Sequence, residues 1–132
     1  MRLITWNCKG AYRRKHGFIS ALNPDLVIVP ECERMSGIDQ ELGAPVLRSF
    51  LWFGSEPKKG LGVLSYGDYT VEVHPAYVER HKWIVPLNVT GATSFLLFAV
   101  WSIPVPSTGS YVQPVLDAFD EYQGLMDQRN VV

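Results

Sequence analysis

The chain has few cysteines, no long apolar run and almost no net charge, and each of these absences excludes a class of protein. Cys8 and Cys32 are too few for a disulfide scaffold and lack the CxxC spacing of a zinc site, so we interpret them as small buried residues. The longest apolar run spans residues 95–101, far short of the roughly 18 residues that cross a membrane. Because the N-terminus also lacks the apolar segment and cleavage site of a secretory signal, we expect a cytoplasmic protein without membrane contact.

The small net charge of −1 hides an uneven distribution. Residues 1–16 hold five basic residues and no acid, whereas residues 17–132 hold seven bases and thirteen acids. Arg13, Arg14 and Lys15 lie in this basic segment, where they either contact an anion such as a phosphate group or form a solvated surface. Lys58 and Lys59 leave the same two interpretations open. We interpret His16, His74 and His81 as surface residues, with His16 near the basic segment.

The length of 132 residues, of which 47% are hydrophobic and 19% charged, fits one globular domain covering residues 1–132. Residues 2–6 and 25–30 read as buried strands around a helix at about 11–22, which makes a β-α-β unit. Five further strands are expected at 51–53, 61–66, 69–74, 83–89 and 95–102, and a helix at about 112–128 that starts near Ser110 and Gln113. This order predicts an α/β (α+β) fold with a mixed, mostly antiparallel sheet.

Two polar residues come directly after the two strands of the β-α-β unit. Asn7 follows the first strand and Glu31 follows the second, and the ends of strands are where sheet proteins collect functional groups. An amide oxygen beside a carboxylate suits a hard cation such as Mg²⁺. The alternative is that Asn7 caps a turn and Glu31 is a surface acid.

Four longer segments carry a family resemblance. They are Ile4-Thr5-Trp6-Asn7-Cys8, Asp25-Leu26-Val27-Ile28-Val29-Pro30-Glu31, Gly60-Leu61-Gly62-Val63-Leu64-Ser65 and Phe95-Leu96-Leu97-Phe98-Ala99-Val100-Trp101. In this order and spacing they resemble the endonuclease/exonuclease/phosphatase superfamily, which includes exonuclease III, apurinic endonucleases and deoxyribonuclease I. The resemblance implies half of a four-layered α/β sandwich and metal-assisted hydrolysis of a phosphoester.

The resemblance also assigns roles to particular residues. It makes Glu31 the carboxylate that holds a catalytic Mg²⁺, with Mn²⁺ as a possible substitute, and Asn7 the amide that assists the metal site. Arg13, Arg14 and Lys15 would approach the substrate. Trp101 falls where the family places a phosphate-contacting tyrosine or histidine; an indole offers one donor and no acceptor, so packing or base stacking is an alternative role.

Two family motifs, an aspartate-x-asparagine strand and a later aspartate-histidine pair, have no counterpart in the sequence. Residues 130–132 resemble the start of a strand, so we expect the N-terminal part of a longer domain, inactive alone and able to pair with a second half or with itself. The first functional hypothesis is a Mg²⁺-dependent phosphoesterase acting on phosphodiesters, with nucleic acid as the favoured substrate. The second is a catalytically inactive nucleic-acid or protein binding domain of the same fold.

Overall fold

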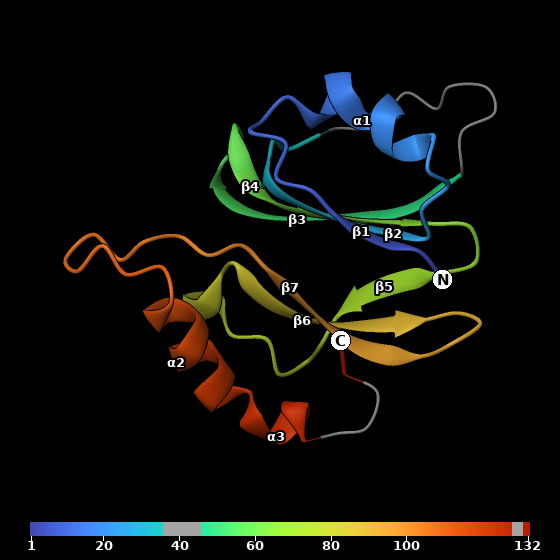
Figure 1. The fold of residues 1–132 in the computed structure, drawn as a ribbon. Coiled ribbons are helices and arrows are strands. Elements are labelled where there is room, and N and C mark those ends of the chain that lie inside the picture. The colour runs from blue at the N-terminus through green and yellow to red at the C-terminus, as the bar shows by residue number, and fades with distance from the viewer. Residues whose placement is uncertain (36–45, 128–130) are drawn as a thin grey trace.

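The structure, a computed structural model, describes residues 1–35, 46–127 and 131–132. Its strands form two sheets that lie face to face, and a helix covers the outer side of each sheet (Figure 1). Four layers follow one another: a helix, the first sheet, the second sheet and a pair of helices. The expected mixed α/β fold class is confirmed, with the strands divided between two sheets.

The first sheet has the strand order β1 (Leu3–Thr5), β2 (Leu26–Cys32), β4 (Lys59–Tyr66) and β3 (Leu47–Glu56). β1 and β2 are parallel and are joined through α1 (Tyr12–Ser20), which confirms the β-α-β unit expected from the sequence. The other neighbours in this sheet are antiparallel.

The continuous apolar run of β2 is explained by burial on both faces of the first sheet. Leu26 and Ile28 point into the core between the two sheets, whereas Val27 and Val29 lie in the core beneath α1. Because successive side chains of a strand point to opposite faces, a strand covered on both sides has apolar residues at every position.

The second sheet consists of β5 (Thr70–Val73), β6 (Ile84–Thr90) and β7 (Phe95–Val100), all antiparallel, with a short 3-10 helix, η1 (Glu79–His81), before β6. One face of this sheet, including Leu87 and Leu97, packs on the first sheet. The other face, including Ile84 and Phe98, packs on α2 (Gln113–Glu121) and α3 (Gln123–Met126).

The helix expected at about 112–128 is two helices, and residue 128 lies outside the described part of the chain. Tyr122 separates them; its side chain is buried and its hydroxyl accepts a hydrogen bond from the Val78 N–H at 3.1 Å. At the start, the Ser110 hydroxyl accepts from the Gln113 N–H at 3.1 Å. The Gln113 side chain donates to Asp117 at 2.6 Å and does not reach back to Ser110, so only the serine hydroxyl caps the start of the helix.

Of the strand expected at residues 130–132, the described residues form an isolated bridge only, and Asn130 lies outside the described part. Val131 pairs with Leu96 of β7 in parallel. The Val132 N–H donates to the Leu96 carbonyl at 2.8 Å, and the Val132 carbonyl accepts from the Phe98 N–H at 2.9 Å. These contacts place Val131 and Val132 beside the edge strand β7.

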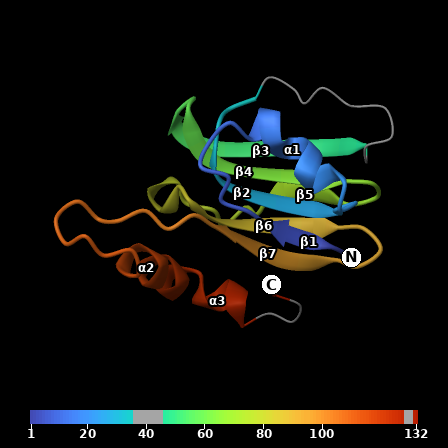
Figure 2. The same cartoon turned by 45° about the horizontal axis from the view of Figure 1, so that its top comes forward.

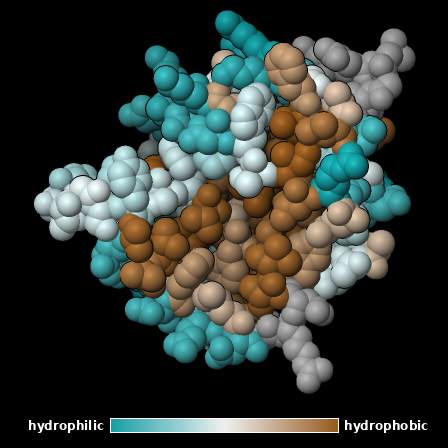
Figure 3. Space-filling model, in the orientation of Figure 1, coloured by the Kyte–Doolittle hydropathy of each residue, from teal (hydrophilic) through white to brown (hydrophobic). Residues whose placement is uncertain are grey.

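β1 and β7 lie at the edges of their sheets on the same side of the sandwich (Figure 2). Figure 3 shows apolar side chains gathered in a band across this side. Leu3 and Ile4 of β1 and Val100 of β7 are half-exposed, and Val132 is exposed. Among the described residues, no helix combines the length and apolar character that crossing a membrane requires.

Candidate functional site

β1, β2 and β7 finish at the same end of the sandwich, on the left in Figure 1, and the β3–β4 hairpin lies at that end too. This end therefore collects four residues at or just beyond the ends of strands: Asn7 after β1, Glu31 near the end of β2, Lys59 at the start of β4 and Trp101 after β7. Functional groups in sheet proteins concentrate at such strand ends, because loops there converge on a rigid frame.

Asn7 and Glu31 are in contact, but the amide nitrogen of Asn7 faces the carboxylate, where the sequence analysis expected the amide oxygen. The Asn7 Nδ2 donates a hydrogen bond to Glu31 Oε1 at 3.2 Å, and the Asn7 Oδ1 accepts one from the Lys9 N–H at 3.0 Å. The parallel pairing of β1 with β2 brings the two side chains together, because it places the ends of both strands side by side. The Lys9 contact fixes which way the amide faces.

Glu31 occupies an unusual backbone conformation. It does not follow β2, as the sequence suggested, but lies within it, where the pairing with β4 shifts register between Val29 and Cys32. Its φ angle is 59°, a left-handed conformation that costs a residue with a side chain about 1–3 kcal/mol. Such strain is concentrated at functional sites, and here it turns the carboxylate toward Asn7.

Lys59 is the third member of the site. Its Nζ lies 3.2 Å from Glu31 Oε2, while the lysine side chain is 63% exposed and that of Glu31 22%. The hydrogen bond from Asn7, followed by that from Lys59, holds the pKa of Glu31 below its usual value. Both carboxylate oxygens thus have a partner within the protein.

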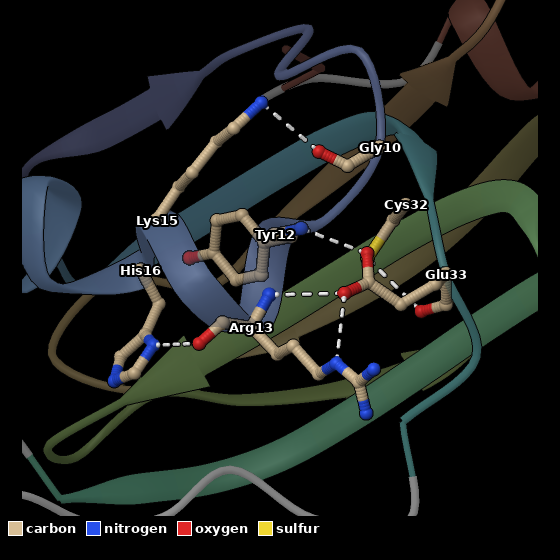
Figure 4. Close-up of polar contacts among 7 residues, drawn as sticks. All are labelled: Gly10, Tyr12, Arg13, Lys15, His16, Cys32 and Glu33. Carbon is tan, nitrogen blue, oxygen red and sulfur yellow. Dashed lines mark hydrogen bonds and ion pairs between the residues drawn. The ribbon is translucent and has the colours of Figure 1, made fainter.

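The basic residues of the N-terminal segment lie in different environments, and Figure 4 shows those of Lys15 and Arg13. Lys15 donates from Nζ to the carbonyls of Cys8 and Gly10, the latter at 3.1 Å, and so fixes the loop between β1 and α1. Arg13 lies beside Glu33, with Nε 3.9 Å from Oε1. Arg14 is exposed. Of the three residues expected to approach a substrate, Arg13 and Arg14 are exposed and Lys15 is half-buried.

Glu33 stabilises the start of α1, a role the sequence did not reveal. Its carboxylate accepts from the backbone N–H groups of Tyr12 at 2.8 Å and Arg13 at 3.1 Å. The first turn of a helix has unpaired N–H groups and a partial positive charge, both of which a carboxylate satisfies. Glu33 and Glu31 are only two residues apart but serve α1 and Asn7 respectively.

The donor set at Asn7 and Glu31 has the chemistry of a partial magnesium site. Mg²⁺ binds oxygen ligands, commonly one or two carboxylates with several waters. Glu31 supplies the carboxylate, and Asn7 Oδ1 keeps a free lone pair beside its bond to Lys9, since a carbonyl oxygen has two. Within residues 1–35, 46–127 and 131–132, no cluster of three or more His, Cys, Asp or Glu residues could hold a metal.

Trp101 packs against Trp83 beyond the end of β7. The ring centroids are 5.6 Å apart with an interplanar angle of 68°, an edge-to-face arrangement favoured by aromatic pairs. The backbone N–H of Trp101 donates to the Trp83 carbonyl at 2.8 Å. Both indoles line a cavity of about 330 Å³, so Trp101 serves packing at this position and also faces a space.

The expectation that His81 is a surface residue is wrong. Its side chain is only 12% exposed, and its Nε2 lies 2.7 Å from Glu121 Oε2. The ring also packs edge-to-face on Tyr122 at 5.7 Å. Glu121 is 40 residues further along the chain and also forms an ion pair with Arg80, so His81 joins η1 to the end of α2.

Comparison with known proteins identified no relative: no family model matches the chain, and no curated protein matches it.

Proposed function

We propose that this chain carries part of the metal site of a Mg²⁺-dependent phosphoester hydrolase, with phosphodiesters, and nucleic acid first among them, as substrates. The observation that carries the proposal is the 3.2 Å contact between Asn7 and Glu31, where a strained backbone presents the carboxylate at the end of the sandwich. The resemblance of four segments to the endonuclease/exonuclease/phosphatase superfamily supports the same function.

In this proposal, Glu31 holds the ion and Asn7 orients the Glu31 carboxylate through its Nδ2 group. Bound Mg²⁺ supplies Lewis acidity and neutralises the charge that develops on the phosphoryl oxygens. The strain at Glu31 keeps the carboxylate in place before the ion arrives, which lowers the ordering needed on binding. Arg14 adds positive charge for the phosphate groups of the substrate.

Lys59 has a role in both states of this site. Its ammonium pairs with Glu31 in the absence of a divalent ion, and an ion bound at Glu31 repels it by like charge. The released side chain is exposed and long enough to turn toward an anion, so the same cation that occupies Glu31 frees Lys59 for the substrate phosphate.

A binding domain without catalysis is the second candidate. The band of apolar side chains across β1 and β7 favours protein contact, because large exposed apolar patches mark interaction sites (Figure 3). A second copy of the chain is the partner we propose. Sedimentation equilibrium between micromolar and millimolar concentrations should show a monomer–dimer transition, and a monomer throughout this range would rule out self-association.

A cytoplasmic location is also proposed, supported by the two free, buried cysteines.

The metal site is tested by isothermal titration calorimetry with MgCl₂ on the wild-type chain and two variants. Glu31→Gln removes the proposed ligand, and Glu72→Gln removes an exposed carboxylate on β5 in the other sheet. The proposal expects a saturable signal in the wild type and in Glu72→Gln that Glu31→Gln loses. Equal signals in all three proteins would show that Mg²⁺ does not bind at Glu31.

A further inference from the structure

The cavity beside Trp83 and Trp101 is separate in composition from the Glu31 site. Three parts of the chain form its walls: residues 80–84, Trp101 with residues 103–106, and Pro114 at the start of α2. The volume of about 330 Å³ lies at the lower end of the range for small-ligand sites, about 300–1,000 Å³. A single small group, rather than an extended chain, matches this volume.

The walls are flat and stiff. Trp83 and Trp101 stand at 68° to each other, so one ring presents its face where the other presents its edge. Pro104, Pro106 and Pro114 add rigid rings to the lining. Aromatic faces and edges favour another aromatic ring over an aliphatic group of equal area, because the ring quadrupoles interact.

The lining also contains a polar group without a partner. Trp83 Nε1 is buried, and it has no hydrogen-bond acceptor in the described part of the chain. Buried donors are nearly always paired in native proteins, and an exception calls for an explanation. A ligand with an acceptor atom in its ring plane would provide one after a small rotation of the indole.

The charged residues at the mouth of the cavity compensate one another. Arg80 and His81 share the carboxylate of Glu121, and Lys82 Nζ lies 3.2 Å from Glu79 Oε1. Because each cation already faces a carboxylate, the mouth does not select for a charged group, and the cavity suits a neutral one.

From these features we infer that the cavity between Trp83 and Trp101 binds a neutral, planar heteroaromatic ring. The ring stacks on the indole of Trp101. Its acceptor atom accepts a hydrogen bond from the Trp83 N–H once the Trp83 indole has rotated. A nucleobase and a simple fused heterocycle share this chemistry, and the test below separates them.

The cavity also connects to the Glu31 site through one hairpin. Lys82 Nζ donates to Ser55 Oγ at 3.2 Å, and Ser55 lies at the end of β3, on the hairpin that carries Lys59. Together with the proposed function, on which this step rests, the relationship makes the bound ring the organic group of the phosphoester substrate. Ring binding itself needs neither Glu31 nor Mg²⁺.

The test is a titration of the ¹⁵N-labelled chain, free of metal, followed by the indole N–H signals of its four tryptophans. Adenosine and quinoline are the ring probes, and cyclohexanol is the non-planar control. We expect saturable shifts of the Trp83 and Trp101 signals with either ring, while those of Trp6 and Trp52 stay in place. Adenosine binding alone would identify a nucleobase site, and binding of both probes a general ring site.

Variants make the test specific to the cavity. Trp101→Leu should weaken binding about tenfold, with partial recovery in Trp101→Phe. Val105→Phe should abolish it by filling the space without removing an indole. Glu31→Gln should leave it unchanged, so ring binding and metal binding can fail independently. Absence of a saturable shift with both rings, equal binding of cyclohexanol, or unchanged binding in Val105→Phe would overturn the inference.

Discussion

Lys59 Nζ lies 3.2 Å from Glu31 Oε2 and so places an ammonium group where a metal ion would approach the carboxylate. The pair joins the β3–β4 hairpin to the end of β2. Lysine and a divalent cation cannot both occupy this oxygen, because their positive charges repel each other. Lys59 therefore competes with a metal ion for the Glu31 carboxylate.

Replacing Lys59 with methionine should raise the affinity for Mg²⁺. The gain should be at most about fivefold, since an exposed ion pair contributes about 0.2–1 kcal/mol. Calorimetric titration measures it, and Lys58→Met is the matched control because it removes the same charge from the same hairpin. An equal gain in both variants would assign the effect to net charge and not to the Glu31 contact.

Glu31 should titrate below its usual pKa of about 4.5. Because the folded-state pKa is lowered, the stability contributed by Glu31 is fully present above the unfolded-state pKa and is lost as the pH falls through the folded-state pKa. Carbon-detected NMR titration of the carboxyl group measures the value directly. Asn7→Ala removes the larger cause and should move the pKa upward. An unchanged pKa in Asn7→Ala would show that the amide contact does not influence the carboxylate.

Lys15 and Arg14 are neighbours in sequence but should differ in their effect on stability. Lys15→Met removes charged hydrogen bonds to the carbonyls of Cys8 and Gly10 and should lower the free energy of unfolding by about 1–3 kcal/mol. Arg14→Met alters an exposed side chain and should change it by less than about 0.5 kcal/mol. Urea denaturation compares the two, and similar losses would contradict the structural role of Lys15.

Glu33 should act on α1 and not on the metal. Glu33→Ala leaves the Tyr12 and Arg13 N–H groups without their acceptor and should lower stability by about 0.5–2 kcal/mol. Hydrogen exchange should quicken first at these two amides. Glu72→Ala, an exposed carboxylate on β5, is the control. Unchanged exchange at both amides in Glu33→Ala would remove the capping role.

The contact between Asn7 and Glu31 could be predicted from sequence because it depends on local order. Two apolar strands around one helix imply parallel pairing, and parallel strands joined in this way end side by side. The continuous apolar run of β2 likewise predicted burial. The run did not say what covers each face, since a second sheet and a helix select the same residues. The strand pattern alone therefore predicted a single mixed sheet, and only the family resemblance implied a layered sandwich.

The contacts that sequence reasoning missed depend on the relative position of distant segments. Lys59 reaches Glu31 because of where the β3–β4 hairpin places it, and a pair of lysines before a glycine is equally typical of an exposed turn. His81 is partly buried because α2 brings Glu121 and Tyr122 against it. No periodicity or motif near His81 indicates its contact with Glu121. None near Glu33 indicates its contact with the start of α1.

The position of bound Mn²⁺ tests whether Glu31, oriented by Asn7, holds a divalent cation. Substoichiometric Mn²⁺ added to the ¹⁵N-labelled chain broadens signals in order of their distance from the ion. The account predicts that the Asn7 side-chain amide and the backbone amides of Cys8 and Glu31 broaden first, and that Glu31→Gln removes this pattern. Broadening centred elsewhere, or unchanged in Glu31→Gln, would contradict it.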